Sequence, residues 1–347
     1  MIGIPGGKTD RSGIQVLSGA LTRKGGDNMN ILKECMDANT IGIGGHIRPD
    51  GDCVGSCLAL YQYLQKCMPQ AYIKVFLEKP AEIFREIKGF EDIDSEYTDQ
   101  TEFDVFFCLD CAAERLGEAA KYFTKAKKTI NIDHHISNAG CGTLNDVRPE
   151  VGSTSEVIYD LINTDQLDVD LAKAIYIGMI HDTGVFQYSN TTPATLEKAA
   201  KLISYGFDFT RLIEETFYQK TYDQTQILGR ALMESIRFLD GRCIVSSVSR
   251  SVMDFYGAKP SDLDGIVNQL RNIKGVECAI FMYEIDVLEY KVSLRSKEKV
   301  DVSEVASYFG GGGHKRAAGC TMKGTFYDCI NNLSLHIEKQ LKEQWEC

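Results

Sequence analysis

The sequence predicts an α/β protein with two domains, the first built on a mainly parallel sheet and the second smaller. Short apolar runs rich in β-branched residues alternate with longer stretches of helical periodicity, which is typical of strands joined by helical crossovers. The chain has 347 residues, of which 44% are hydrophobic and 25% charged. This length exceeds that of one average domain, and this composition argues against a mostly disordered, collagenous or membrane-spanning chain.

The first domain is expected over residues 29–220. Four short apolar runs predict its strands, and the helical period over 54–66 follows the first of them. Because parallel strands need crossover connections, these strands are expected to form one sheet covered on both faces. The expected strands are 40–47, 71–77, 104–109 and 128–132.

Residues 1–28 precede this pattern and are rich in Gly and Ser. They show no sustained period, and they lack the continuous apolar stretch that a signal peptide requires. We therefore interpret them as an N-terminal extension or leader, with Met29 as an alternative start, and leave them out of the predicted fold.

The following segment, 152–237, is expected to be mostly helical, with Gly178, Gly184 and Gly206 at turns or close approaches. A linker helix is predicted over 221–238, and a second α/β domain over 239–347. The patterns that indicate this second domain are a strand at 242–248, a helix at 262–272 and a two-stranded ribbon formed by 277–285 and 290–294.

The charge balance limits the class of partner. The chain has 38 basic and 49 acidic residues, a net charge of −11, and an isoelectric point near 5.1. This disfavours a long basic track for duplex nucleic acid, so a nucleic-acid substrate has to be short or held locally. No apolar run reaches the length of a membrane-spanning helix, so no membrane partner is expected.

The twelve cysteines are scattered along the chain. A chain of this length without a secretory leader does not suggest a disulfide scaffold, so we interpret the thiols as reduced and the protein as cytoplasmic. Cys108 and Cys111 have the spacing of a redox or zinc pair, but no second pair at zinc-finger spacing exists. We expect them, like Cys53 and Cys57, to face the core as small hydrophobes.

Three possible ligands, His46, Asp50 and Asp52, follow the first predicted strand and precede the first helix. In open α/β sheets, ligands gather at the carboxyl ends of strands, and Pro49 and Gly51 would sharpen the turn that aims these side chains. The alternative is that one of the two aspartates only caps the helix. From this segment alone, both interpretations stay open.

Two further clusters end the next predicted strands. Asp110 follows an apolar strand, where a carboxylate lacks hydration unless it faces a site, although an exposed strand end is the alternative. Asp133, His134 and His135 close another strand. Because neighbouring side chains diverge, one imidazole can ligate a metal while the other faces substrate, and Asp133 can orient a ring. Core filling is the weaker interpretation for these histidines.

The last ligand candidate, Asp182, ends a helical run that breaks at Gly184. The C-terminus of a helix disfavours a negative charge, so a cation partner becomes more plausible. The whole set offers four carboxylates and two imidazoles, which suit two hard or borderline divalent ions such as Mn²⁺ better than a thiolate zinc site. Two such ions at about 3.5–4 Å can stabilise both oxygens of a phosphoryl displacement. The set is His46, Asp50, Asp52, Asp110, His134 and Asp182.

Two further groups are candidates for phosphate binding. Gly55 and Ser56 lie early in the first helix, where backbone N–H groups can meet an anion. Residues 309–319 carry four consecutive glycines followed by His314 and two cations, which can form an anion-binding nest or a flexible loop. Arg295 ends a strand and can hold a phosphate or stack on a base, while an exposed strand-end arginine is equally compatible.

In this order the motifs resemble the DHH phosphoesterase superfamily, and more narrowly its NrnA type, in which a DHH domain precedes a DHH-associated C-terminal domain. The resemblance covers roughly residues 30–345. It rests on the segments His46 to Ser56, Asp110, Asp133 to His135, Asp182 to Gly184, and Gly311 to Gly319.

The resemblance implies a hydrolase that uses two Mn²⁺ ions, for which Mg²⁺ or Co²⁺ can substitute, with its active site in the cleft between the domains. It implies that Asp110 and Asp182 are shared or paired ligands of the ions. It also implies that His135 contacts the scissile phosphate or protonates the leaving oxygen, with Asp133 beside it. The six ligand candidates take the metal roles. The residues implied to bind the rest of the substrate from the second domain are Arg295, Gly312, Gly313 and His314.

The implied substrates are short oligoribonucleotides, cleaved from an end, and 3′-phosphoadenosine 5′-phosphate (PAP). Cyclic di-AMP and the linear dinucleotide pApA are the alternative. A RecJ-like exonuclease for long single-stranded DNA ranks lower because the chain is acidic, and an inorganic pyrophosphatase ranks lower because the glycine-rich motif is of the nucleotide-handling type. A protein that binds a nucleotide without cleaving it is expected to have lost at least one metal-ligating carboxylate, and all of them are present in this sequence. A homodimer is a candidate assembly, since symmetric dimers are common.

Overall fold

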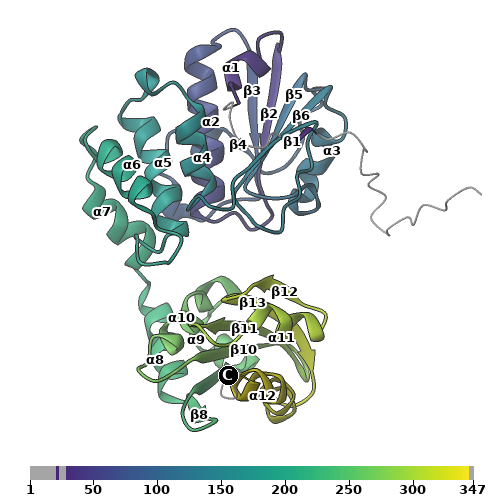
Figure 1. The fold of residues 1–347 in the computed structure, drawn as a ribbon, viewed down its shortest axis with the longest axis vertical. Helices are drawn as coiled ribbons and strands as arrows, with labels where there is room; N and C mark the ends of the chain where they lie inside the picture. Colours follow the sequence, from purple (N-terminus) through teal and green to yellow (C-terminus); the bar gives the residue numbers. More distant parts are fainter. Residues whose placement is uncertain (1–20, 23–28, 344–347) are drawn as a thin grey trace, which may run out of the picture. The chain divides into compact units, whose positions relative to one another are not determined.

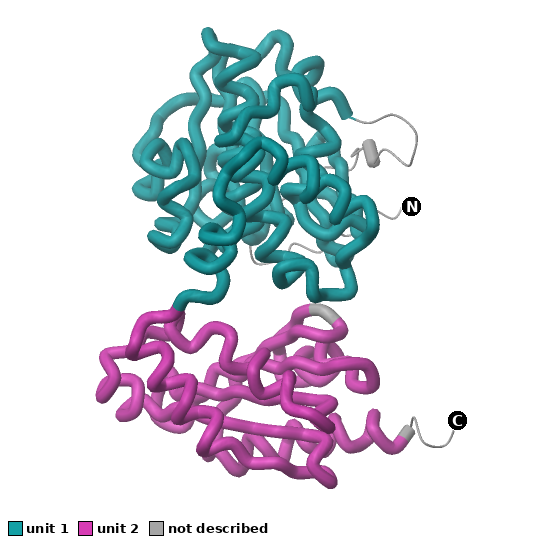
Figure 2. The backbone as a smooth tube through the Cα atoms, turned by 90° about the vertical axis from the view of Figure 1, so that its left-hand side faces the viewer, with its two compact units in different colours: residues 1–219 teal, residues 220–347 magenta. Residues whose placement is uncertain are grey.

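A computed structural model describes residues 21–22 and 29–343 (Figure 1). Most of the predicted N-terminal extension, 1–28, therefore lies outside the described residues. The chain divides into two compact units, Met1–Gln219 and Lys220–Cys347 (Figure 2). Within the described residues, none of the helices is both long and apolar enough to cross a bilayer.

The first unit contains a parallel sheet of seven strands in the order β1-β7-β6-β5-β2-β3-β4. Every neighbouring pair is parallel, which confirms the predicted sheet type. The two residues of β1 lie within the predicted extension and pair with β7 at the edge. The strands are β1 (Leu21–Thr22), β2 (Thr40–Gly44), β3 (Tyr72–Phe76), β4 (Ile93–Asp94), β5 (Val105–Leu109), β6 (Lys128–Asp133) and β7 (Leu144–Val147).

Helices cover both faces of this sheet, with α2, α4 and α5 on one side and α3 on the other (Figure 1). Strand β5 is buried along its whole length. Its consecutive residues Phe106 and Phe107 belong to separate apolar clusters on opposite faces of the sheet. This explains why its sequence is continuously apolar. The helices are α1 (Ile31–Glu34), α2 (Gly51–Cys67), α3 (Ala120–Phe123), α4 (Thr154–Leu161), α5 (Val169–Asp182), α6 (Pro193–Ile203) and α7 (Phe209–Ile213), followed by a π-helical turn (Glu214–Tyr218).

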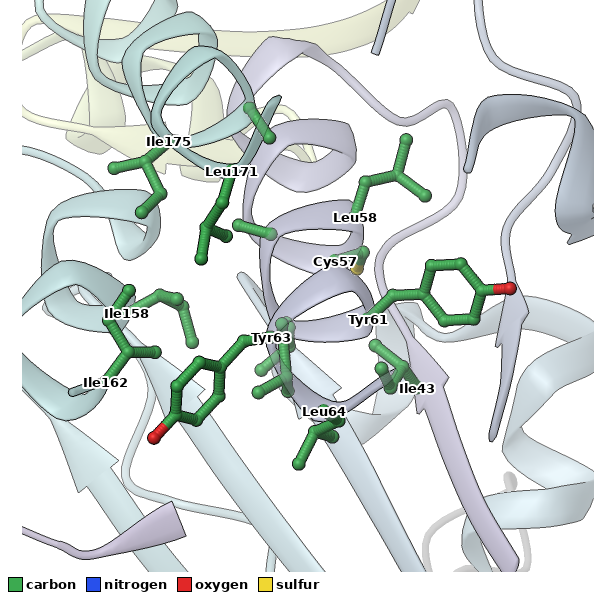
Figure 3. Packing of buried hydrophobic residues seen from close by; sticks show 14 of the residues in the cluster. Ile43, Cys57, Leu58, Tyr61, Tyr63, Leu64, Ile158, Ile162, Leu171 and Ile175 are labelled. Atoms are coloured by element: carbon green, nitrogen blue, oxygen red, sulfur yellow. The ribbon is translucent and has the colours of Figure 1, made fainter. Parts of the chain in front are cut away.

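Helix α2 is buried from Gly51 to Leu64 and packs against α4 and α5 (Figure 3). Its approach to α5 depends on glycine, because a Cβ on Gly55 would lie 2.7 Å from the Ala174 carbonyl oxygen and 2.9 Å from the Gly178 nitrogen. The two backbones therefore touch where Gly55 meets Gly178. This close approach brings the N-terminus of α2 near the C-terminal half of α5.

The second unit has a mixed sheet in the order β12-β13-β11-β10-β9-β8, in which only the β9–β10 pair is parallel. The predicted ribbon is the antiparallel pair β10–β11. Separate apolar clusters hold α11 and α12 to one set of strand residues and α8 to α10 to another. The elements are α8 (Tyr222–Met233), β8 (Ile236–Phe238), β9 (Cys243–Val248), α9 (Arg250–Tyr256), α10 (Ile266–Arg271), β10 (Cys278–Asp286), β11 (Glu289–Ser296), α11 (Val302–Tyr308), β12 (Gly312–His314), β13 (Ala317–Lys323) and α12 (Phe326–Glu343).

The segment expected to link the domains forms α8 and β8. In α8, Ile227 and Ala231 are fully buried and belong to a core cluster of the second unit. The helical stretch predicted over 152–237 therefore ends at Met233, because β8 begins at Ile236 and pairs with β9.

Candidate metal centre

Three neighbouring strands, β6, β5 and β2, end at the same edge of the first sheet. Asp133 is the last residue of β6, Asp110 directly follows β5, and His46 comes two residues after β2. The N-terminus of α2 and the C-terminus of α5 supply the other predicted ligands. The sheet topology therefore collects side chains from distant parts of the sequence at the position where open α/β sheets hold their ligands.

The imidazole of His46 presents one ring nitrogen to two carboxylates. Its Nδ1 lies 2.8 Å from the carbonyl oxygen of Ile47, which can accept a hydrogen bond from an Nδ1–H. Its Nε2 lies 3.4 Å from Asp110 Oδ2 and 3.7 Å from Asp50 Oδ1. With Nδ1 occupied by the carbonyl, Nε2 is the atom available to a metal ion.

A second group of donors consists of Asp52, His134 and Asp182, whose ligand atoms lie within 4.8 Å of one another. His134 Nε2 lies 2.8 Å from Asp182 Oδ2. This nitrogen is buried, yet it lacks a partner with the geometry of a hydrogen bond. Because a buried polar atom without such a partner is costly, the donor set around this nitrogen fits a cation-binding site.

Asp110 lies between the two groups of donors. Its Oδ2 is 3.4 Å from His46 Nε2, and its Oδ1 is 3.8 Å from His134 Nε2. The carboxylate is almost fully buried, with 2% of its side chain exposed. One oxygen thus faces each imidazole, an arrangement that allows a single carboxylate to contact two cations.

Asp50 combines the two roles that the sequence left open. Its Oδ1 accepts hydrogen bonds of 3.1 Å from the backbone N–H groups of Asp52 and Cys53, and so caps α2. The same carboxylate faces His46. Capping and membership of the donor cluster are therefore compatible for this residue.

The N-terminus of α4 holds two of the carboxylates, and sequence reasoning missed it. The backbone N–H groups of Thr154 and Ser155 donate to Asp52 Oδ2 and Oδ1 at 2.7 and 2.9 Å. The Thr154 hydroxyl donates to Asp110 Oδ1 at 2.9 Å. The available signal was Ser153 followed three residues later by Glu156, the pattern that starts a helix, and Ser153 Oγ does accept from Glu156 N–H.

The Asp133 carboxylate contacts His135 and belongs to none of the possible metal-binding groups among the described residues. Its Oδ1 lies 2.7 Å from His135 Nδ1 and also accepts from the backbone N–H groups of His134 and His135. Its Oδ2 accepts from Asn138 Nδ2 at 2.5 Å. This fully buried carboxylate therefore fixes the orientation of the His135 ring, which remains 22% exposed.

A buried asparagine, which the sequence gave no reason to single out, shapes the loop that carries Asp110. Asn131 Nδ2 donates to the carbonyl oxygens of Cys108 and Cys111 on either side of Asp110. Its own oxygen accepts from Asn138 Nδ2 at 2.9 Å. This network connects the Asp110 loop to the residues that orient His135.

The protonation equilibria reflect several carboxylates crowded in one buried place. Burial raises the pKa of Asp52, and the neighbouring charges of Asp110 and Asp182 raise it further. Burial likewise raises the pKa of Asp182 to about 6. Burial alone would lower the pKa of His134, but the Asp182 carboxylate outweighs it and raises that pKa to about 10. Each of these shifts favours the protonated form of the group, and divalent cations compete with protons for such donors.

The cysteine next to Asp52 also lies against these donors. A ligand atom from each of His46, Cys53 and Asp110 falls within 4.8 Å of the others. Cys53 is buried as the sequence predicted, and burial raises the pKa of its thiol. The prediction that Cys53 faces the core is therefore correct about its burial. The prediction did not include its proximity to His46 and Asp110.

The residues predicted to bind substrate are divided between the two units. Ser56 is fully buried, and its hydroxyl donates to the carbonyl oxygen of Cys53 within α2. In the second unit, Arg295 is half-buried on β11 and its Nη1 donates to the Leu294 carbonyl oxygen. Gly312 and Gly313 belong to β12 and pair with β13, while the side chain of His314 lies outside what the structure describes.

Comparisons with known proteins agree with this architecture. The DHH family, N-terminal domain, matches residues 40–179, and the DHHA1 domain matches residues 240–343. The chain is 30% identical over 312 residues to a Thermus thermophilus protein named bifunctional oligoribonuclease and PAP phosphatase NrnA, covering 87% of this chain and 90% of that protein. A Bacillus subtilis protein of the same name is 28% identical over 311 residues, covering 88% and 96%.

Solved structures show the same fold. A crystal structure of an exopolyphosphatase-related protein from Bacteroides fragilis matches with a TM-score of 0.82 and 28% identity, over 88% of this chain and 94% of that one. The Mn²⁺ complex of RecJ from Thermus thermophilus matches with a TM-score of 0.50 and 12% identity, over 89% and 54%. At that identity, the likeness to RecJ concerns the fold alone.

Proposed function

We propose a substrate and a mechanism from the premise that this chain belongs to the DHH phosphoesterase family and is a hydrolase of phosphoester bonds. The substrates are short oligoribonucleotides and PAP, since the relatives from Thermus and Bacillus carry these two activities in their names. The observation that carries the mechanism is the Asp110 carboxylate, which faces His46 on one side and His134 on the other.

The donor set supports Mn²⁺ as the cation, with Mg²⁺ or Co²⁺ as substitutes. Carboxylate oxygens and imidazole nitrogens suit ions of this hardness. One ion would be held by His46, Asp50 and Asp110, and the other by Asp52, His134, Asp182 and Asp110. When bound, two such ions lower the pKa of a water molecule and neutralise the charge that develops on the phosphoryl oxygens.

The protein's own groups would arrange the rest of the reaction. Asp110 keeps the two halves of the centre together, and the N–H groups at the start of α4 keep the Asp52 carboxylate in place. Burial opposes the charged form of His135, but the Asp133 carboxylate bonded to its Nδ1 raises the pKa of this ring. A protonated His135 held in this orientation can deliver a proton to the leaving oxygen.

In this proposal the second unit binds the remainder of the substrate through Arg295, Gly312, Gly313 and His314. The acidic net charge of −11 supports a short substrate rather than a long strand, because a processive nuclease needs an extended basic groove. Cyclic di-AMP and pApA contain the same type of bond and are the alternative substrates.

A product assay tests the substrate class. The protein is incubated with Mn²⁺ and, separately, PAP, pApA, cyclic di-AMP and RNA of two to about ten nucleotides, lengths that bracket one compact groove. We expect release of mononucleotides from the shortest RNAs and of phosphate from PAP. Faster turnover of cyclic di-AMP than of both would favour the alternative, and no turnover of any of the four would contradict the proposal.

The Asp110→Asn variant tests the shared carboxylate. Removing one negative charge between the two donor groups, with little change in shape, should lower kcat/KM for PAP by about 10³-fold. Asp165→Asn, on the exposed turn before α5, serves as the matched control and should retain full activity. Equal activity of the Asp110 variant and this control would rule out the shared role.

A further inference from the structure

Cys53 lies on the first turn of α2, directly after Asp52, and its side chain is fully buried. Its sulfur packs against Gly45, the residue after β2, where a Cβ would lie only 2.3 Å from Sγ. Because Gly45 has no side chain, the thiol can occupy this space. Gly45 directly precedes His46, so the thiol lies next to the segment that carries this histidine.

Cys53 shares this space with two of the metal donors. One ligand atom each from His46, Cys53 and Asp110 lies within 4.8 Å of the others. The same point of the fold therefore brings the thiol next to the His46 ring and the Asp110 carboxylate. Three donors of different chemistry, a nitrogen, an oxygen and a sulfur, thus converge on one buried point.

The other thiols nearby are not part of such a group in the described residues. Cys57, one turn further along α2, is also fully buried, and its Sγ lies 3.2 Å from the position of a Cβ on Gly45. Cys108 and Cys111, which flank Asp110 in the sequence, have their sulfur atoms 3.7 Å apart. Only Cys53 joins His46 and Asp110 as a potential ligand among these cysteines.

We propose that Cys53 is a sulfur ligand in the half of the centre formed by His46 and Asp110, and that it gives this half a preference for thiophilic divalent cations such as Cd²⁺, Zn²⁺ and Co²⁺. The inference rests on the proposed function in one respect, because both need His46 and Asp110 to hold a cation. As the sulfur–metal bond forms, the S–H bond breaks and its proton leaves to solvent.

The chemical consequence is a centre with two unequal halves. Mn²⁺ favours oxygen donors and stands lowest in the affinity order of divalent transition ions, whereas thiolates favour softer ions. The half with Asp52, His134 and Asp182 offers only oxygen and nitrogen. Thiophilic cations should therefore enter the Cys53 half first and displace Mn²⁺ from it.

Cobalt spectroscopy of the full-length protein tests this ligand in the absence of substrate. A thiolate bound to Co²⁺ gives a charge-transfer band in the near ultraviolet that oxygen and nitrogen ligands do not give. We expect this band in the wild type and in Cys57→Ala, the matched control on the same helix. We expect it to disappear in both Cys53→Ala and Cys53→Ser, and Cys53→Ala should weaken Cd²⁺ binding by about tenfold or more.

The band persisting in Cys53→Ala, or vanishing equally in Cys57→Ala, would overturn the proposal. If the Cys53 variants do not fold, ¹¹³Cd NMR of the unmodified protein decides the matter, because sulfur ligation shifts the resonance strongly downfield and its absence would refute the ligand. Activity is measured separately: a cobalt band without hydrolysis contradicts the proposed function alone, whereas Mn²⁺-dependent hydrolysis without a sulfur signal contradicts the Cys53 proposal alone.

Discussion

At the scale of single residues, Asp110 shows how the chain aims a functional group. Its φ of 58° lies in the left-handed region, which aspartate tolerates better than most residues but which still costs of order 1 kcal/mol. The two carbonyl oxygens bonded by Asn131 flank it and hold this conformation. The strain is thus maintained by a buried side chain from the neighbouring strand, and it points the carboxylate at both histidines.

Thr154 provides a test of how such a carboxylate is positioned. Thr154→Val keeps the shape but removes the hydroxyl that donates to Asp110 Oδ1, so we expect kcat to fall by about tenfold and the Mn²⁺ dissociation constant to rise by a similar factor. Thr154→Ser restores the donor and should recover most of both. Isothermal titration with Mn²⁺ and steady-state kinetics measure the two effects. If valine and serine behave alike, the hydroxyl has no positioning role.

His181 makes folding stability depend on pH. Burial lowers the pKa of this ring to about 4, well below its usual value of 6.5, with Asp50 opposing the shift only partly. The unfolded chain therefore takes up this proton first as the pH falls. The stabilising effect of the neutral ring is complete above pH 6.5 and is lost toward pH 4, at up to about 1.4 kcal/mol per pH unit.

Urea unfolding with EDTA present measures this dependence. Between pH 8 and pH 5, the wild type should lose more stability than His181→Gln, whose side chain does not titrate. Two parallel stability curves over this range would show that the ring is not held neutral by the fold.

At the scale of elements, the contact between α2 and α5 sets the spacing of the donors. Asp52 lies on the first turn of α2 and Asp182 on the last turn of α5. Gly55 and Gly178 let the two helices touch in between. A Cβ on Gly178 would also meet the Ser155 hydroxyl at 1.8 Å and Asp52 Oδ1 at 2.6 Å. The same glycine thus allows the two helices to pack closely and leaves room for the Asp52 carboxylate.

Gly55→Ala should therefore separate the helices and destabilise the protein by about 1–3 kcal/mol, the usual effect of overpacking. Gly229→Ala is the matched control, because that glycine lies inside α8 with no atom within 4 Å of its added Cβ. The control should stabilise the protein by about 0.5–1 kcal/mol through higher helix propensity. Thermal unfolding of both variants checks the opposite signs, and a stabilising Gly55→Ala would show that the close approach is not needed.

At the scale of the whole molecule, the net charge of the protein favours a short nucleic-acid substrate over a long one. The net charge of −11 leaves room for only a few local phosphate contacts. For single-stranded nucleic acids, each contact contributes about 0.7 to the slope of log affinity against log salt. We expect KM for an RNA of about five nucleotides to rise with a slope of about 2 or less. Kinetics between low and high KCl at constant Mn²⁺ measure it, and a much steeper slope would indicate an extended basic track.

The sequence predicted both halves of the architecture because local patterns carry that information. Continuous apolar runs identified β2, β3, β5 and β6, and their alternation with helical periods indicated a parallel sheet. The three clusters at His46, Asp110 and Asp133 were recognisable because charged residues directly follow buried strands. The sequence did not predict where α8 ends, because the three-residue strand β8 that follows it is too short to show a pattern of its own.

What the sequence determined by itself was the type of fold and the list of candidate donors, since both follow from short-range patterns and residue chemistry. The tertiary structure alone decided which of these side chains lie within reach of one another. The backbone N–H that donates to Asp52 Oδ2 belongs to Thr154, 102 residues away. Cys53 lies close to His46 because α2 packs against the end of β2. Strand order and helix packing create these contacts, and neither is written in the local periodicity from which a fold class can be predicted.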